Sequence, residues 1–184
     1  AEYAKKEGKV SESSSCNPPF NNYGLSKLSA SLRALYLGEI KKIQTIIVRV
    51  FNPIGPLDSD KKLLPQVIKS LNKNKTIELS PCNHKRDFIY IDRLIDGLIK
   101  LMLSGYKRPV NLGNPEEYSM LQFAQLVKDK IDSSSNIIFK NLPVDDPKRR
   151  CPDISLAKNK FNWYPKVKLD DGLEETISWY RKIV

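Results

Sequence analysis

Residues 45–51 (TIIVRVF) form an apolar, β-branched run that stops abruptly at residues 52–56 (NPIGP). A nearly continuous apolar run is typical of a parallel strand buried on both faces, since a strand with one wet face alternates apolar and polar residues. Proline and glycine directly after the run break the strand. Parallel strands need a long crossover connection, which is usually a helix, so this run favours an α/β architecture.

The rest of the chain alternates between helical and extended patterns. Residues 8–22 are rich in Ser, Asn and Pro and are expected to form a loop, in which Asn21 or Asn22 caps the helix that follows. Elsewhere, helices are predicted where apolar residues recur at helical spacing, and strands where short apolar runs lie between turn signals. The predicted helices are 23–40, 64–71, 92–103, 120–131, 155–161 and 172–183, and the predicted strands are 45–51, 76–79, 88–91, 110–112 and 137–140.

Three further predicted helices follow a residue that can cap them. Ser119 stands three positions before Gln122, which is the spacing of a capping box. Asp92 and Asp153 are placed to cap the helices that begin beside them. The charged turn at 84–87 and the basic loop at 146–153 are therefore explained as ordinary turns and caps unless other features assign them a ligand.

The charge of the chain limits its partners. The 184 residues hold 31 Lys and Arg against 21 Asp and Glu, a formal net charge of +10. Because the lysines are scattered and few aromatic residues lie among them, the charge indicates solubility or phosphate-bearing small molecules rather than nucleic acid. No apolar run approaches the roughly 18 residues of a membrane span, and the first residues show no signal-peptide pattern. No membrane association is predicted.

The three cysteines, Cys16, Cys82 and Cys151, are odd in number and far apart. Their spacing predicts neither a metal site nor a disulfide framework, which favours a reducing, cytoplasmic location. His84 is the single histidine and has no partner pattern, so a surface role is expected for it rather than a role in a site.

Tyr23 and Lys27 are the strongest candidates for catalysis. Residues at i and i+4 of a helix lie on one face, so the Lys27 ammonium can sit beside the Tyr23 phenol and favour the phenolate. A tyrosine has an ordinary pKa of about 10 and needs such a neighbour to transfer protons near neutrality. The same spacing also occurs by chance in basic surface helices, and the pair alone does not decide between the two interpretations.

Two turns carry candidate ligand-binding residues. Asn52 stands at the carboxyl end of a predicted parallel strand, the edge where open α/β sheets bind ligands, and its amide can contact a phosphate or sugar oxygen. Arg86 could bind a diphosphate through its planar fork, with Asp87 orienting it or pairing with it. Asp153 could cap a helix or accept a hydrogen bond from a ribose hydroxyl.

Seven segments taken in order resemble a known family. They are Glu2-Tyr3, Tyr23 to Leu28 (YGLSKL), Arg49 to Pro56 (RVFNPIGP), Arg86 to Asp92 (RDFIYID), Asn111 to Gly113 (NLG), Arg149 to Asp153 (RRCPD) and Trp163 to Lys166 (WYPK). Together they resemble the extended short-chain dehydrogenase/reductases that act on nucleotide-activated sugars, the NAD-dependent epimerase/dehydratase family. The resemblance covers nearly the whole chain.

The resemblance implies a role for each candidate. Tyr23 looks like the catalytic acid/base, and Lys27 like the residue that favours its phenolate and holds the nicotinamide ribose of NAD or NADP. Such enzymes take a hydride from C4 of the sugar and return it, through a 4-keto intermediate. The other implied contacts are the substrate's phosphate or sugar for Asn52, the nicotinamide for Pro53 and Ile54, and the phosphates and ribose of a nucleotide-diphosphate sugar for Arg86, Arg150 and Asp153.

The resemblance also implies a fold and its boundaries. Residues 1–56 are expected to be the end of a doubly wound, Rossmann-like parallel sheet, and residues 57–184 mainly a small α/β substrate-binding lobe with elements that return to the sheet. The family's Gly-x-x-Gly-x-x-Gly turn, which binds the pyrophosphate, has no counterpart here. We therefore expect the C-terminal portion of such an enzyme, without turnover and with poor NAD(P) binding on its own.

Several alternatives stay open on the sequence. The reaction could be that of an epimerase or a 4,6-dehydratase, or instead that of a 4-keto-reductase or a UDP-glucuronate decarboxylase. A non-catalytic sugar-nucleotide-binding fragment is the alternative from another class. Glu2 resembles an acid of the dehydratases, although a structural role is favoured for it. Family members often dimerise through two helices, one of which would be the Tyr23 helix, so a homodimer is a further expectation.

Overall fold

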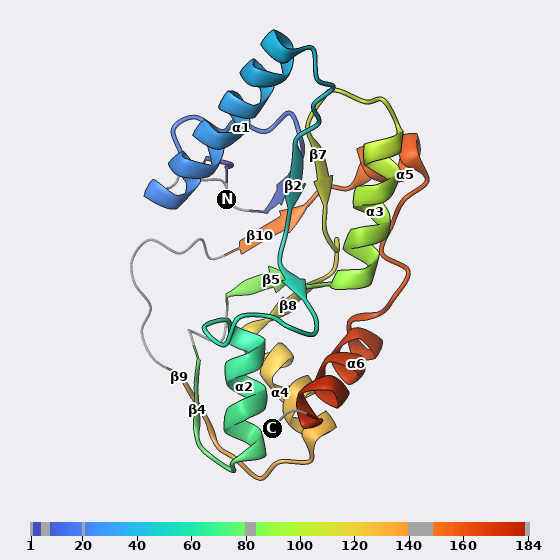
Figure 1. Cartoon of the computed structure of the whole chain (residues 1–184). Helices are drawn as coiled ribbons and strands as arrows, with labels where there is room; N and C mark the ends of the chain where they lie inside the picture. The colour runs from blue at the N-terminus through green and yellow to red at the C-terminus, as the bar shows by residue number, and fades with distance from the viewer. Residues whose placement is uncertain (1, 5–7, 20, 80–83, 140–148, 183–184) are drawn as a thin grey trace.

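The computed structural model describes residues 2–4, 8–19, 21–79, 84–139 and 149–182, and it confirms the α/β fold with parallel strand pairs. Strands β2 (Val48–Val50) and β7 (Val110–Leu112) pair in parallel. Helix α1 (Asn22–Lys41) lies on one side of this pair, and α3 (Ile91–Leu103) with α5 (Ser155–Phe161) on the other (Figure 1).

The layer of α3 and α5 is held by an apolar core. Leu94 and Leu101 of α3 pack with Val110 and Leu112 of β7 and with Trp163, and all five are buried. The Trp163 indole Nε1 also donates a hydrogen bond of 3.1 Å to the Arg93 carbonyl, which ties the segment after α5 to α3. Trp163 therefore serves packing, as predicted, whereas the neighbouring Tyr164 is exposed.

A second core lies at the other end of the molecule. Helices α2 (Leu63–Asn72), α4 (Met120–Ile131) and α6 (Leu169–Arg181) gather there beside the parallel pair β4 (Ile77–Leu79) and β9 (Ile137–Phe139) (Figure 1). Phe88 and Phe123 stack at its centre with ring centroids 3.9 Å apart.

Short strands connect the two ends. Strands β1 (Lys9–Val10), β10 (Arg149–Pro152), β5 (Lys85–Asp87) and β8 (Glu117–Ser119) form one sheet, in which only the β5–β8 pair is antiparallel. Next to it, β3 (Pro53–Ile54) pairs in parallel with β6 (Ile89–Tyr90).

Most predicted elements are present. The Asn21 side chain caps α1, and Ser119 with Gln122 forms the predicted capping box. Asp92 does not cap α3: Tyr90 holds the cap position, and Asp92 lies in the first turn of the helix, where a negative charge is favourable. The predicted loop at 8–22 contains β1, and the basic loop ends in β10. Among the described residues, no helix is long and apolar enough to cross a bilayer.

Candidate active site

Helix α1 brings Tyr23 and Lys27 to one face in its first two turns. Asn21 Oδ1 accepts a hydrogen bond of 2.8 Å from the Gly24 amide, which fixes where the helix begins. The Lys27 Nζ lies 5.4 Å from the centre of the Tyr23 ring. The Tyr23 side chain is 62% exposed, so its hydroxyl is open to a ligand.

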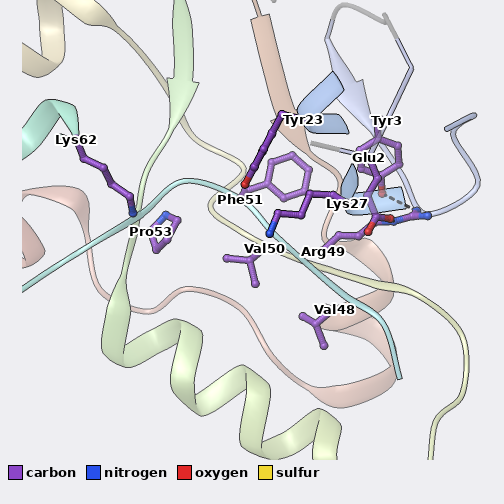
Figure 2. A pocket seen from close by; sticks show the side chains of 10 residues that line it. All are labelled: Glu2, Tyr3, Tyr23, Lys27, Val48, Arg49, Val50, Phe51, Pro53 and Lys62. Carbon is purple, nitrogen blue, oxygen red and sulfur yellow. Dashed lines mark hydrogen bonds and ion pairs between the residues drawn. The ribbon is translucent and has the colours of Figure 1, made fainter. Parts of the chain in front are cut away.

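The pair lines an open cleft of about 360 Å³. Figure 2 shows Tyr23 and Lys27 reaching from α1 toward Phe51 and Val50 of the facing strand segment. A half-open, partly apolar concavity with a few polar groups is the usual form of a small-molecule site. The lining residues are Glu2, Tyr3, Tyr23, Lys27, Val48, Arg49, Val50, Phe51, Pro53 and Lys62.

The turn after β2 divides the other predicted residues between two sides. Pro53 lines the cleft, as its predicted nicotinamide contact requires. Asn52 is exposed but is not among the residues that line it. Ile54 is 4% exposed and packs in the core around α2 and α4, so the structure does not bring it to the cleft.

Asn52 instead contacts a buried carboxyl group. Its Nδ2 donates a hydrogen bond of 2.7 Å to Asp87 Oδ1. Asp87 is fully buried, and its Oδ2 accepts a longer bond of 3.4 Å from the Asn114 amide. Burial raises the pKa of Asp87 to about 7, although its hydrogen bonds and the charge of Arg86 act in the opposite direction.

Arg86 and Arg150 are direct partners in the register of β5 and β10. Arg86 is half-buried, and its Nη1 donates a hydrogen bond of 2.8 Å to the neighbouring Lys85 carbonyl. The Arg150 backbone belongs to β10, whereas its side chain lies outside what the structure describes. The pairing nevertheless puts the two predicted phosphate-binding residues side by side.

Asp153 follows β10 and precedes Ile154, which holds the cap position of α5 without a side-chain cap. The Asp153 Oδ1 accepts a hydrogen bond of 2.9 Å from the Ser155 amide at the start of α5, and bonding to Ser155 lowers the pKa of Asp153 below its ordinary value. Asp153 therefore does not cap α5 as predicted, but its carboxylate binds the first amide of the helix from one position before the cap. The ribose contact stays a prediction.

A buried network beneath the cleft could not be located from the sequence. Arg49 Nε forms an ion pair of 2.9 Å with Glu2 Oε2, and Ser31 donates a hydrogen bond to Glu2 Oε1. Arg49 Nη1 also donates to the Tyr3 hydroxyl at 3.2 Å. The Tyr3 hydroxyl in turn donates to Asn111 Oδ1 at 2.5 Å. The one available signal was an arginine inside the apolar run 45–51.

The ion pair gives Glu2 a structural role in this structure. Its carboxylate is occupied by Arg49 and Ser31, and its side chain is 11% exposed.

His84 is buried, contrary to the surface position expected for a lone histidine, and its carbonyl accepts a hydrogen bond from the Met120 amide at the start of α4. Within the described part of the chain, no group of three or more His, Cys, Asp and Glu side chains is placed to hold a metal ion. Cys82 lies outside the described residues.

The parallel strand pairs, the helix of Tyr23 and Lys27 and the cleft beside it fit the Rossmann-like α/β class expected from the sequence. Residues 1–113 match the profile of the NAD dependent epimerase/dehydratase family, which is more than half of the 184 residues. The chain therefore belongs to the NAD-dependent epimerase/dehydratase family.

Two curated relatives are UDP-glucuronic acid decarboxylases. The chain is 36% identical over 162 residues to UDP-glucuronic acid decarboxylase 1 of Arabidopsis thaliana, a match that covers 86% of this chain and 37% of that protein. It is also 36% identical over 143 residues to UDP-glucuronic acid decarboxylase 1 of Xenopus tropicalis, covering 76% and 34%. The match thus spans little more than a third of these relatives.

Solved structures agree on the fold. A UDP-glucuronic acid 4-epimerase from Bacillus cereus, in complex with UDP-glucuronic acid and NAD, has a TM-score of 0.90 at 27% identity, covering 100% of this chain and 59% of that one. A UDP-glucose 4-epimerase from Thermotoga maritima has a TM-score of 0.90 at 21% identity, covering 100% and 60%. The second match supports the fold alone.

Proposed function

We propose that this chain supplies the proton-transfer pair and part of the substrate site of an NAD-dependent enzyme that acts on a nucleotide-diphosphate sugar through a 4-keto intermediate. The observation that carries the proposal is the position of Tyr23 and Lys27, which share one cleft with Pro53. Membership of the epimerase/dehydratase family supports the same chemistry.

Tyr23 acts as the acid/base in this proposal. Oxidation at C4 of a sugar removes a hydride from carbon and a proton from the hydroxyl oxygen, and the Tyr23 phenolate takes that proton. Lys27, whose ammonium lies beside the ring, stabilises the phenolate by its charge. When the hydride is returned, Tyr23 gives the proton back to the oxygen.

The residues present fit one end of the cofactor. Tyr23 and Lys27 would hold the nicotinamide ribose through a hydroxyl and an ammonium group, and Pro53 would face the ring from the opposite wall of the cleft. NAD accepts and returns the hydride when it is bound. The glycine-rich turn that binds the pyrophosphate in this family is not among these 184 residues.

UDP-glucuronate decarboxylation is the reaction that the comparisons favour. The two curated relatives cited above carry that name, and a structural neighbour at 27% identity binds UDP-glucuronic acid. A 4-keto uronate has its carboxylate β to the ketone, so the carbon–carbon bond to the carboxylate can break to release CO2. The resulting enolate is protonated at C5, and return of the hydride to C4 then gives the UDP-pentose. Epimerisation would instead return the hydride to the opposite face and keep the carboxylate.

Product analysis separates the reactions. The natural chain that contains these residues is incubated with UDP-glucuronic acid and NAD, and the nucleotide sugars are resolved by chromatography and mass spectrometry. A UDP-pentose with stoichiometric CO2 is expected, and a product of unchanged mass would indicate an epimerase. If UDP-glucuronic acid, UDP-glucose and dTDP-glucose all stay unconverted and unbound, the proposed function is wrong.

A cytoplasmic location, expected from the number and spacing of the cysteines, and a homodimer, expected from the family resemblance, remain predictions. Helix α1 favours the dimer because it exposes the large apolar side chains of Leu32, Tyr36 and Ile40. Sedimentation velocity is expected to show a dimer, and replacing Leu32 and Ile40 by Ser is expected to reduce its share. A monomer at all concentrations would contradict this prediction.

A further inference from the structure

We propose that Asp87 is a positioning residue of the substrate site, which holds the Asn52 carboxamide so that its Oδ1 accepts a hydrogen bond from a hydroxyl group of the sugar. Asn52 would then recognise the sugar and not a phosphate oxygen. This inference rests on the proposed function for the nature of the ligand, but the geometry of the Asp87–Asn52 pair stands by itself.

The first step concerns the orientation of the carboxamide. The Asn52 Nδ2 donates the hydrogen bond of 2.7 Å to Asp87 Oδ1, and whenever Asp87 is ionised this is the only orientation that works, because a carboxylate accepts hydrogen bonds and donates none. The other end of the amide is its oxygen. Among the described residues, no side chain or backbone group donates a hydrogen bond to Asn52 Oδ1, and Asn52 is exposed. The oxygen is therefore presented to a ligand as an acceptor.

The second step concerns the chemistry of that ligand. A phosphate oxygen carries no proton and cannot donate to Asn52 Oδ1, whereas a sugar hydroxyl can. The Asp87 carboxyl beside Nδ2 also makes a second anion unfavourable near the nitrogen when Asp87 is ionised. Arg86 is adjacent to Asp87 in β5, so its side chain leaves the strand on the other face. The proposed phosphate contact of Arg86 and the Asp87 carboxyl that holds Asn52 thus lie on different faces of β5.

The third step concerns what holds Asp87 in place. The Asn114 amide donates to Asp87 Oδ2 at 3.4 Å, and the Asn114 side chain donates to the Phe88 carbonyl at 3.1 Å. A Cβ added to Gly113 would lie 3.0 Å from Asp87 Oδ2, which shows how closely the backbone approaches the carboxyl group. Asp87 is thus fixed by a turn outside the cleft, as expected of a supporting residue.

The charged and titratable groups around Asp87 come from three strands. Arg86 is its neighbour in β5, Glu117 is its direct partner in β8, and Cys151 approaches from β10. Glu117 is bound by the Arg149 guanidinium in a fork with contacts of 2.5 to 2.9 Å. Burial and the charges of Glu117 and Asp87 raise the pKa of the Cys151 thiol to about 11. Asp87 is therefore the group beside Asn52 that changes charge near neutral pH.

The test follows the Asn52 side-chain amide directly by nuclear magnetic resonance. In the 184-residue chain, the chemical shifts of the Asn52 Nδ2 group are expected to change with pH. Their midpoint should equal the midpoint of the chemical-shift titration of the Asp87 carboxyl carbon. The Asn111 Nδ2 signals are expected to stay, because that nitrogen donates to the Val10 and Asp153 carbonyls. Asp87→Asn should abolish the Asn52 titration, whereas Glu117→Gln should preserve it. An Asn52 amide that ignores the Asp87 titration overturns the proposal.

A ligand measurement separates this inference from the proposed function. Titration calorimetry of Asp87→Asn is expected to show about tenfold weaker binding of UDP-glucuronic acid, because one positioned hydrogen bond to the sugar is lost. The binding of UDP is expected to stay unchanged. Equal losses for both ligands would assign Asn52 to the nucleotide and overturn the proposal. If the wild-type chain binds neither ligand, the proposed binding of a nucleotide sugar by this chain is wrong. The resonance titration still decides whether Asp87 positions Asn52.

Discussion

The buried Asp87 carboxyl is expected to make the stability of the protein depend on pH. Its pKa rises from an ordinary value of 3.8 to about 7 on folding, mainly through burial. Each unit of difference between the folded and unfolded pKa corresponds to about 1.36 kcal/mol, so ionising Asp87 in the folded protein costs about 4 kcal/mol more than in the unfolded chain.

The sign follows from proton binding. Between pH of about 4 and about 7, the folded protein keeps the Asp87 proton that the unfolded chain has released. The stability that Asp87 contributes is therefore complete below pH of about 4 and is lost as the pH rises through about 7. About 3 kcal/mol of this loss falls between pH of about 5 and about 8.5.

The assay compares urea unfolding of the wild type with Asp87→Asn, which has nearly the same shape and does not titrate. The free energy of unfolding is measured at steps across this pH range, and the wild-type value minus the variant value cancels the contributions of other groups. This difference is expected to fall by about 3 kcal/mol as the pH rises. A difference that stays constant within about 1 kcal/mol would refute the reasoning.

Two further predictions concern stability, and the first tests the ion pair beneath the cleft. Arg49→Met leaves Glu2 unpaired at 11% exposure and is expected to cost about 3–5 kcal/mol in urea unfolding, whereas Glu2→Gln with Arg49→Met should cost less than Arg49→Met alone. A double variant that costs the sum of the single changes would contradict a direct ion pair. Ser119→Ala removes the acceptor for the Gln122 amide and is expected to cost about 1 kcal/mol, or about 2–4 °C in Tm, in a thermal melt. An unchanged Tm would show that the capping box contributes nothing to stability.

Local patterns predicted most of the secondary structure. The helices carry apolar residues at helical spacing, and α1 and α4 begin at the predicted cap residues Asn21 and Ser119. Strands β5 and β10 could not be found in this way because their sequences are charged (KRD and RRCP). They exist through pairing between distant segments, such as Arg149 with Lys85, and no local signal reports such pairing.

The candidate site was predictable in its residue types and less so in its geometry. The Tyr-x-x-x-Lys spacing places Tyr23 and Lys27 correctly on one face, because helix geometry alone determines it. The surroundings of Asn52 and Ile54 depend on partners far along the chain, Asp87 for Asn52 and the core around α2 and α4 for Ile54. Asp87 was predicted to orient or pair with Arg86, whereas the structure shows its hydrogen bond with Asn52, 35 positions away.

Turnover of Tyr23→Phe tests the central claim that Tyr23 is the proton-transfer residue. The measurement compares kcat for UDP-glucuronic acid in the natural chain containing these residues, in Tyr23→Phe and in the control Tyr36→Phe. Tyr36 lies on the same helix at 64% exposure, close to the 62% of Tyr23. Loss of the Tyr23 hydroxyl is expected to lower kcat by about 10²- to 10⁴-fold with UDP binding unchanged, while Tyr36→Phe keeps the wild-type value. A Tyr23→Phe enzyme that turns over as fast as the Tyr36→Phe control would contradict the assignment.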